Sequence, residues 1–209
     1  MRSLLFSAIE SIEIALRARL SYLHGLRYGA LGYLDSANFN ARHNTDRFLE
    51  NIQREITSNR NVPFVQHHQQ KYHGNFPVWV ITELFTFGML SYFYSDLLTQ
   101  DQKSIARQYN TSHTVLKSWL RCCTDARNIC AHYGRLYYRV FSAAPAGFNL
   151  SASVRWRMWA VMLVIKALYP SPQKWSEEFV PRAEKLFQKY ADDIDLYHLG
   201  FPRDWKAHL

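Results

Sequence analysis

The sequence has no long hydrophobic run, which excludes a protein with a membrane-spanning helix. Its most apolar stretch, VRWRMWAVMLVIKALYP, contains Arg155, Arg157 and Lys166, so no segment offers the roughly 18 apolar residues of a membrane-spanning helix. The apolar N-terminus is interrupted by Glu10 and Glu13 and lacks a small-residue cleavage site, so we interpret it as a helix of the fold rather than a secretory signal. We therefore expect a soluble, cytoplasmic protein.

Cysteine is also scarce. The 209 residues include 3 cysteines, two of them adjacent at Cys122 and Cys123, which does not match a disulfide framework and indicates a reducing compartment. The chain is 48% hydrophobic and 15% aromatic, enough for one sizeable core, and we expect a single domain over residues 1–209. Lys and Arg number 25 against 17 acidic residues, and this formal charge of +8 suits a polyanionic partner.

Strand-like alternation is almost absent, and apolar residues recur at helical spacing, so the sequence predicts an all-α fold. Glycine, proline and capping residues indicate the helix ends. Gly25 is expected to close the first helix, Asn44 or Thr45 to start the second, and Pro63 and Gly74 to bound the third. The expected helices cover 3–24, 46–59, 64–74, 78–98, 101–110, 114–140, 153–168 and an amphipathic segment after Trp175.

The segment DARNICAHYGRLYYR, residues 125–139, lies in the expected 114–140 helix. At about 100° per residue, Arg127 lies on the flank of a polar stripe centred on Asn128 and made of Arg121, Asp125, Asn128, His132, Arg135 and Arg139. The opposite face is apolar and is expected to face the core; it comprises Trp119, Cys122, Ala126, Ile129, Tyr133, Leu136, Tyr137 and Val140.

Such a stripe suits phosphodiester chemistry. A histidine titrates near neutrality, and guanidinium groups match phosphate oxygens. In metal-independent RNA cleavage, His132 is the candidate for proton transfer, Arg127 for stabilising charge on phosphorus, and Asn128, one turn before His132, for orienting the imidazole or phosphate. One chain supplies one such histidine, whereas an acid and a base are both wanted, so we expect a homodimer.

Other interpretations of the same residues remain open. A polar stripe is most often the solvated face of a helix, and a protein that binds a regulatory RNA without cleaving it would use the same stripe. SIARQYNTSHTVLKSW, residues 104–119, resembles a DNA-binding helix-turn-helix, but its second helix carries Val115, Leu116 and Trp119 where base-contacting groups would lie, which favours a packed helical hairpin.

The remaining candidate sites are weaker. His68 and His73 are five residues apart and do not share a helical face, and Cys123 and Cys130 are two turns apart, so we expect no metal and no cofactor. The aromatic segments are expected to be mostly core. Tyr138, the tyrosine beside the stripe least committed to the apolar face, is a candidate RNA contact together with Arg121, Arg135 and Arg139.

ARNICAHYGRLYYR resembles the signature of the HEPN superfamily, in which Arg, a polar residue, three further positions and then His identify ribonuclease members. Four blocks that span nearly the whole chain narrow the resemblance to the Abi-like family of bacterial abortive-infection proteins, of the AbiD and AbiF type. They are SAIESIEIALRARLSYLHGLRYGALGYLDSANF, PVWVITELFTFGMLSYFYSDL, VLKSWLRCCTDARNICAHYGRLYYR and the closing GFPRDWKAHL.

The resemblance implies an α-helical HEPN-like bundle that dimerises so that two motifs face one cleft. It also implies metal-independent RNA cleavage in phage defence, with an RNA or protein antitoxin as a regulatory partner. The motif transfers to Arg127, Asn128 and His132, and Arg135 matches a further Arg after the His. Members of the family usually carry an additional segment before the first helix, and we expect that segment to be absent here.

Overall fold

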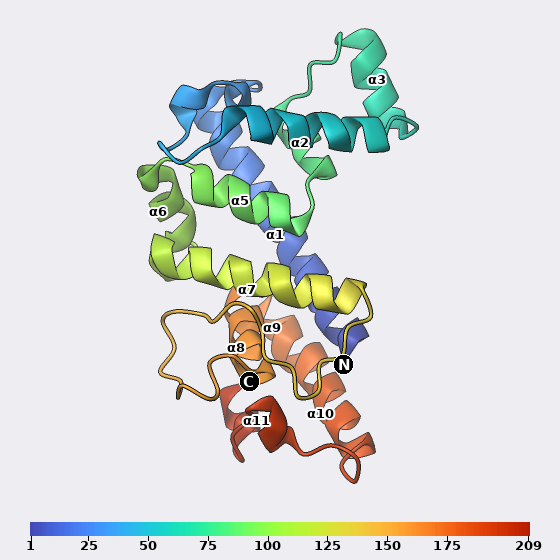
Figure 1. Ribbon diagram of the computed structural model, residues 1–209, viewed down its shortest axis with the longest axis vertical. Helices are drawn as coiled ribbons and strands as arrows, with labels where there is room; N and C mark the ends of the chain where they lie inside the picture. Colours follow the sequence, from blue (N-terminus) through green and yellow to red (C-terminus); the bar gives the residue numbers. More distant parts are fainter. The chain divides into compact units, whose positions relative to one another are not determined.

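The computed structural model describes residues 1–209 and is all-α, which confirms the predicted fold class (Figure 1). Outside the helices and turns, its only β feature is an isolated bridge between Phe39 and Leu97. None of its helices combines the length and the apolar character needed to cross a bilayer.

The chain divides into two compact units. One consists of Leu16–Gln108, and the other, which we call the motif unit, joins Met1–Ala15 to Tyr109–Leu209. Helix α1 (Arg2–Tyr28) contributes its first turns to the motif unit and the remainder to the 16–108 unit. Apolar residues recur along α1 every three or four positions and are fully buried at Leu5, Ile9, Ile12, Leu16 and Leu20.

The 16–108 unit is built from short helices that capping residues delimit. Asn44 starts the second helix, as predicted, because its side chain accepts a hydrogen bond from the Arg47 N–H at 2.9 Å. After α1 come 3₁₀ turns at Gly32–Leu34 and Ser36–Asn38, then α2 (Thr45–Ser58), α3 (Pro63–Lys71), α4 (Val78–Ile81), a 3₁₀ turn (Thr82–Leu84), α5 (Phe87–Asp96) and α6 (Thr99–Arg107).

Two predicted boundaries in this unit are wrong. Helix α1 continues through Gly25 and stops near Gly29, which has a φ of 78°. The lack of a side chain at Gly25 instead allows Val78 to pack closely against α1, since a Cβ at this position would lie 3.2 Å from a Val78 methyl group.

The predicted 78–98 helix is broken between Thr82 and Phe87. Arg17 stabilises the break, because its Nε donates to the Thr82 carbonyl at 2.9 Å and its Nη2 donates to the Phe85 carbonyl at 3.3 Å. The side chain of Thr86 then caps α5 by accepting from the Met89 N–H. An arginine on α1 thus takes over carbonyls that a continuous helix would have satisfied internally.

In the motif unit, α7 (His113–Ala131) packs against the almost wholly buried α8 (Met158–Leu168). The helix predicted over 153–168 begins at Met158 in the structure, five residues later than expected. The later elements are α9 (Pro172–Lys174), a π turn (Trp175–Phe179), α10 (Val180–Lys189), a 3₁₀ turn (Leu196–Leu199) and α11 (Trp205–His208).

Residues 132–157 contain no helix, although the sequence predicted one as far as 140. Figure 1 shows this long loop following α7. Side chains of α7 hold it in place. The Trp119 indole N–H donates to the Ala146 carbonyl at 2.8 Å, and Ser118 Oγ accepts from the Ala146 N–H at 2.9 Å. The loop also closes on itself, since the Phe141 N–H donates to the Trp156 carbonyl at 2.9 Å. Tertiary hydrogen bonds thus order a segment that lacks regular structure.

Candidate active site at the end of helix α7

Helix α7 is amphipathic as predicted up to its last turn. Its inner side is buried at Leu116, Trp119, Leu120, Cys122, Cys123, Ala126, Ile129 and Cys130. On the other side Arg121 and Asn128 are exposed, and Arg127 lies half-buried at the flank. The helix projection therefore placed the first half of the polar stripe correctly.

The helix ends at the motif histidine. His132 is the C-cap residue and is exposed, and its backbone N–H donates to the Asn128 carbonyl at 3.0 Å. Beyond it, the Tyr133 N–H bonds to the Cys130 carbonyl and the Gly134 N–H bonds to the Ile129 carbonyl at 2.8 Å, which together form a Schellman turn. Asn128 and His132 are thus held one turn apart on an accessible helix end.

Tyr133 occupies the left-handed position of this turn, with a φ of 56°. It was predicted to face the core but is 81% exposed, because the left-handed residue turns the chain away from the helix axis. Arg2 supports the turn from the start of α1: its Nη1 donates to the Tyr133 carbonyl at 3.2 Å, and its guanidinium lies 5.7 Å from the centre of the Tyr133 ring.

Arg127 has an environment unlike that of the other arginines of the stripe. Its guanidinium carbon lies 5.7 Å from the centre of the Phe6 ring on α1, and its Nε is buried without a hydrogen-bond partner. The ring packs against one side of the guanidinium, and the Nε donor is left without a hydrogen-bond partner. Sequence reasoning missed both Arg2 and Phe6, because only the packing of α1 against the end of α7 brings them to the motif.

Asp125 is committed to a structural role. One carboxylate oxygen accepts from the Ser142 N–H at 2.7 Å and from the Ser142 hydroxyl at 2.8 Å. This pair of hydrogen bonds ties the 132–157 loop to the outer side of α7, close in sequence to the motif. Asp125 thereby fixes the loop rather than presenting a free carboxylate beside His132.

The second half of the predicted stripe does not exist as a helical face. Arg135, Tyr138 and Arg139 lie in the irregular segment after the Schellman turn, and Tyr138 itself has a left-handed φ of 59°. All three are exposed, so they remain accessible to a polyanion, but their register with Asn128 is lost. Val140, predicted as core, is 58% exposed for the same reason, whereas Leu136 and half-buried Tyr137 still point inward.

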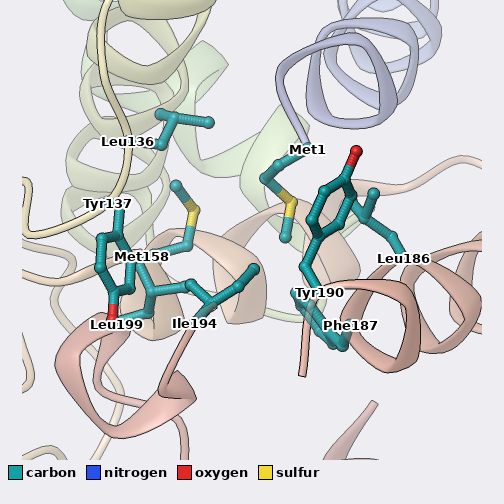
Figure 2. A pocket seen from close by; sticks show the side chains of 9 residues that line it. All are labelled: Met1, Leu136, Tyr137, Met158, Leu186, Phe187, Tyr190, Ile194 and Leu199. Atoms are coloured by element: carbon teal, nitrogen blue, oxygen red, sulfur yellow. The ribbon is translucent and has the colours of Figure 1, made fainter. Parts of the chain in front are cut away.

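An apolar hollow of about 350 Å³ lies beneath this segment (Figure 2). Its wall is made of hydrophobic and tyrosine side chains, namely Met1, Leu136, Tyr137, Met158, Leu186, Phe187, Tyr190, Ile194 and Leu199. The Tyr137 hydroxyl accepts from the Asp195 N–H at 3.1 Å, which fixes one rim. The wall contains no cationic side chain, and it receives the Leu136 and Tyr137 side chains from the start of the loop.

The weaker candidates are dispersed. His43 pairs with Asp96 at 3.0 Å, and His68 stacks on Phe76 at 5.2 Å between ring centres. No group of three or more His, Cys, Asp or Glu side chains is arranged to hold a metal ion. In the segment compared with a helix-turn-helix, Leu116 and Trp119 are buried.

Comparison with known proteins agrees with the resemblance of the motif blocks. The family model described as Abi-like protein matches residues 1–138, which is more than half of the chain and includes all of α7 and the motif. Searches among curated proteins and among solved structures gave no match. The match over residues 1–138 places this chain in the Abi-like protein family.

Proposed function

We propose that this protein is a metal-independent endoribonuclease of the HEPN type that acts in abortive infection against phage, in a toxin–antitoxin setting with an RNA or protein antitoxin. The observation that carries the proposal is the end of α7, where Arg127 has a buried, unpartnered Nε and Asn128 and His132 are exposed one turn apart. The Abi-like family membership supports the biological setting.

In the proposed reaction, the 2′-hydroxyl of the substrate attacks the adjacent phosphorus while an imidazole of His132 removes its proton. Arg127 stabilises the negative charge that develops on the phosphoryl oxygens, and Asn128 orients the phosphate or the imidazole. The 5′-oxygen leaves with a proton from a second imidazole, for which a homodimer would supply His132 of the partner subunit. The products are a 2′,3′-cyclic phosphate and a 5′-hydroxyl.

The test is incubation of wild-type protein, His132→Ala and Arg127→Ala with labelled total bacterial RNA in EDTA, followed by analysis of the ends. Because loss of a proton-transfer group slows catalysis about 10²–10⁴-fold, His132→Ala should show almost no cleavage. His67→Ala, which removes an exposed histidine of α3, is the matched control and should cleave at the wild-type rate. Sedimentation analysis of the wild type checks the homodimer.

The second candidate function is RNA binding without cleavage, since an exposed basic helix end also suits a bound regulatory RNA. If wild type and His132→Ala bind RNA equally and neither produces 2′,3′-cyclic ends, the ribonuclease proposal fails and the binding function takes its place. Preferential competition by duplex DNA, weakened by changes at Ser112 or His113, would instead support the helix-turn-helix interpretation.

A further inference from the structure

A second, larger hollow of about 640 Å³ lies in the motif unit, on the part of the chain that follows the family match. Its volume falls in the range of sites that take small organic molecules, about 300–1,000 Å³. Residues 149–159 form one wall and residues 197–203 form the other, with Tyr138 at the edge.

The two walls are held together by close packing. Gly200 has a φ of 81°, and a Cβ at this position would lie 2.9 Å from the Cβ of Arg157 and 3.4 Å from a Val154 methyl group. The floor is aromatic, since Trp159 and Phe201 are buried with ring centres 4.9 Å apart. The hollow is therefore shaped by well-packed residues, and its base is apolar.

Aromatic rings line the opening. Tyr197 is 76% exposed and Tyr138 is 50% exposed, so part of each ring is open to solvent. The His198 ring lies 4.6 Å from the Tyr138 ring, centre to centre. Exposed tyrosine faces around a concave site are the surfaces on which proteins stack unpaired bases.

The lining also includes two arginines, and it contains no carboxylate side chain. Arg157 donates through Nη1 to the Tyr138 carbonyl at 3.2 Å, which leaves its other donors available, and Arg203 is exposed and forms no ion pair. The hydroxyls of Ser151 and Ser153, 3.1 Å apart, and the side-chain amide of Asn149 add neutral hydrogen-bonding groups. Guanidinium groups bind phosphate, and hydroxyls and amides can meet a ribose or a base edge.

We propose that this hollow binds one unpaired nucleotide of single-stranded RNA, with the base stacked on Tyr197 or Tyr138 and a phosphate held by Arg157 and Arg203. The proposal rests on the proposed function, because it makes the hollow a second contact for the RNA that the α7 motif acts on. It assigns to the C-terminal part of the chain a role in holding the RNA rather than in cleaving it.

The test uses the full chain carrying His132→Ala, so that bound RNA is not cleaved, and a fluorescent single-stranded oligoribonucleotide of about 12 nucleotides, followed by anisotropy. Tyr197→Ala and Arg203→Ala should each raise the Kd about tenfold, and Tyr197→Phe, which keeps the ring, should restore binding. Tyr22→Ala and Arg182→Ala remove an exposed tyrosine and an exposed arginine elsewhere and should leave the Kd unchanged. Circular dichroism checks that every variant is folded.

Three results would overturn the inference. They are an unchanged Kd in both Tyr197→Ala and Arg203→Ala, displacement of the RNA by micromolar AMP, which would assign the hollow to free nucleotides, and equal displacement by polyglutamate, which would reduce it to a basic patch. Cleavage is scored separately with the wild-type motif. Wild type that binds through Tyr197 but never cleaves defeats only the ribonuclease function, whereas cleavage with a Kd indifferent to Tyr197 and Arg203 defeats only this inference.

Discussion

The left-handed Tyr133 makes the turn that ends α7 a measurable source of strain. A non-glycine residue in this conformation costs about 1–2 kcal/mol. Glycine is free of that cost but loses about 0.5–1 kcal/mol more backbone entropy on folding than alanine does. We therefore expect Tyr133→Gly to be more stable than Tyr133→Ala by about 1 kcal/mol, which corresponds to a Tm difference of about 2–4 °C for a chain of this length.

The comparison is between the two variants, because both lose the ring and its contact with Arg2 and only one keeps the strain. Thermal unfolding followed by circular dichroism gives the two Tm values. Gly134→Ala is the counterpart: its Cβ would lie 2.9 Å from an Ile129 methyl group and 3.1 Å from the Ile129 carbonyl oxygen, so it should lower the Tm below that of the wild type. A Tm for Tyr133→Gly equal to or below that of Tyr133→Ala would refute the assignment of strain to this residue.

Three further predictions follow from buried groups. Burial lowers the pKa of His24 from 6.5 to about 4. Because the unfolded chain then binds a proton that the folded chain does not, the free energy of unfolding should fall by roughly 3 kcal/mol as the pH drops from 6.5 toward 4. In urea unfolding, His24→Phe should lack this part of the pH dependence. Asp101→Ala should cost about 3 kcal/mol in urea unfolding, because the fully buried carboxylate pairs with Arg27 and accepts from the Tyr28 hydroxyl at 2.6 Å; a loss no larger than that of the exposed control Asp192→Ala would contradict this. Burial raises the pKa of Cys122 to about 12 and raises that of Cys123 well above its ordinary value. Iodoacetamide at pH 8 should therefore label both thiols only after unfolding, and rapid labelling of the native protein would count against the buried assignment.

The sequence predicted the helices where local signals act alone. Asn44 and Pro63 start their helices as expected, and the apolar spacing of α7 holds as far as Cys130. The errors come from partners distant in sequence. No local sequence signal near Thr82 indicates that the Arg17 side chain will donate a hydrogen bond to the Thr82 carbonyl.

The end of α7 was missed for a related reason. Tyr133, Leu136, Tyr137 and Val140 have helical apolar spacing, so periodicity alone extends the helix to 140. The loop instead forms hydrogen bonds to α7 through Asp125, a partner that the spacing of residues 133–140 does not reveal. Only part of the candidate site could be predicted from the sequence. The spacing of the motif identified Arg127, Asn128 and His132, whereas the Phe6 ring reaches Arg127 only through tertiary packing.

Because α7 stops at Ala131, the motif spans a boundary between two kinds of backbone. Arg127 and Asn128 lie in a helix whose inner face is buried, where amide protons should exchange with solvent slowly. His132 stands at the entrance to the irregular 132–157 segment, whose amides depend on a few tertiary bonds and should exchange sooner. Release of that segment would displace the imidazole while the guanidinium stays on its helix, so local opening offers a way to separate the two halves of the motif without unfolding the protein.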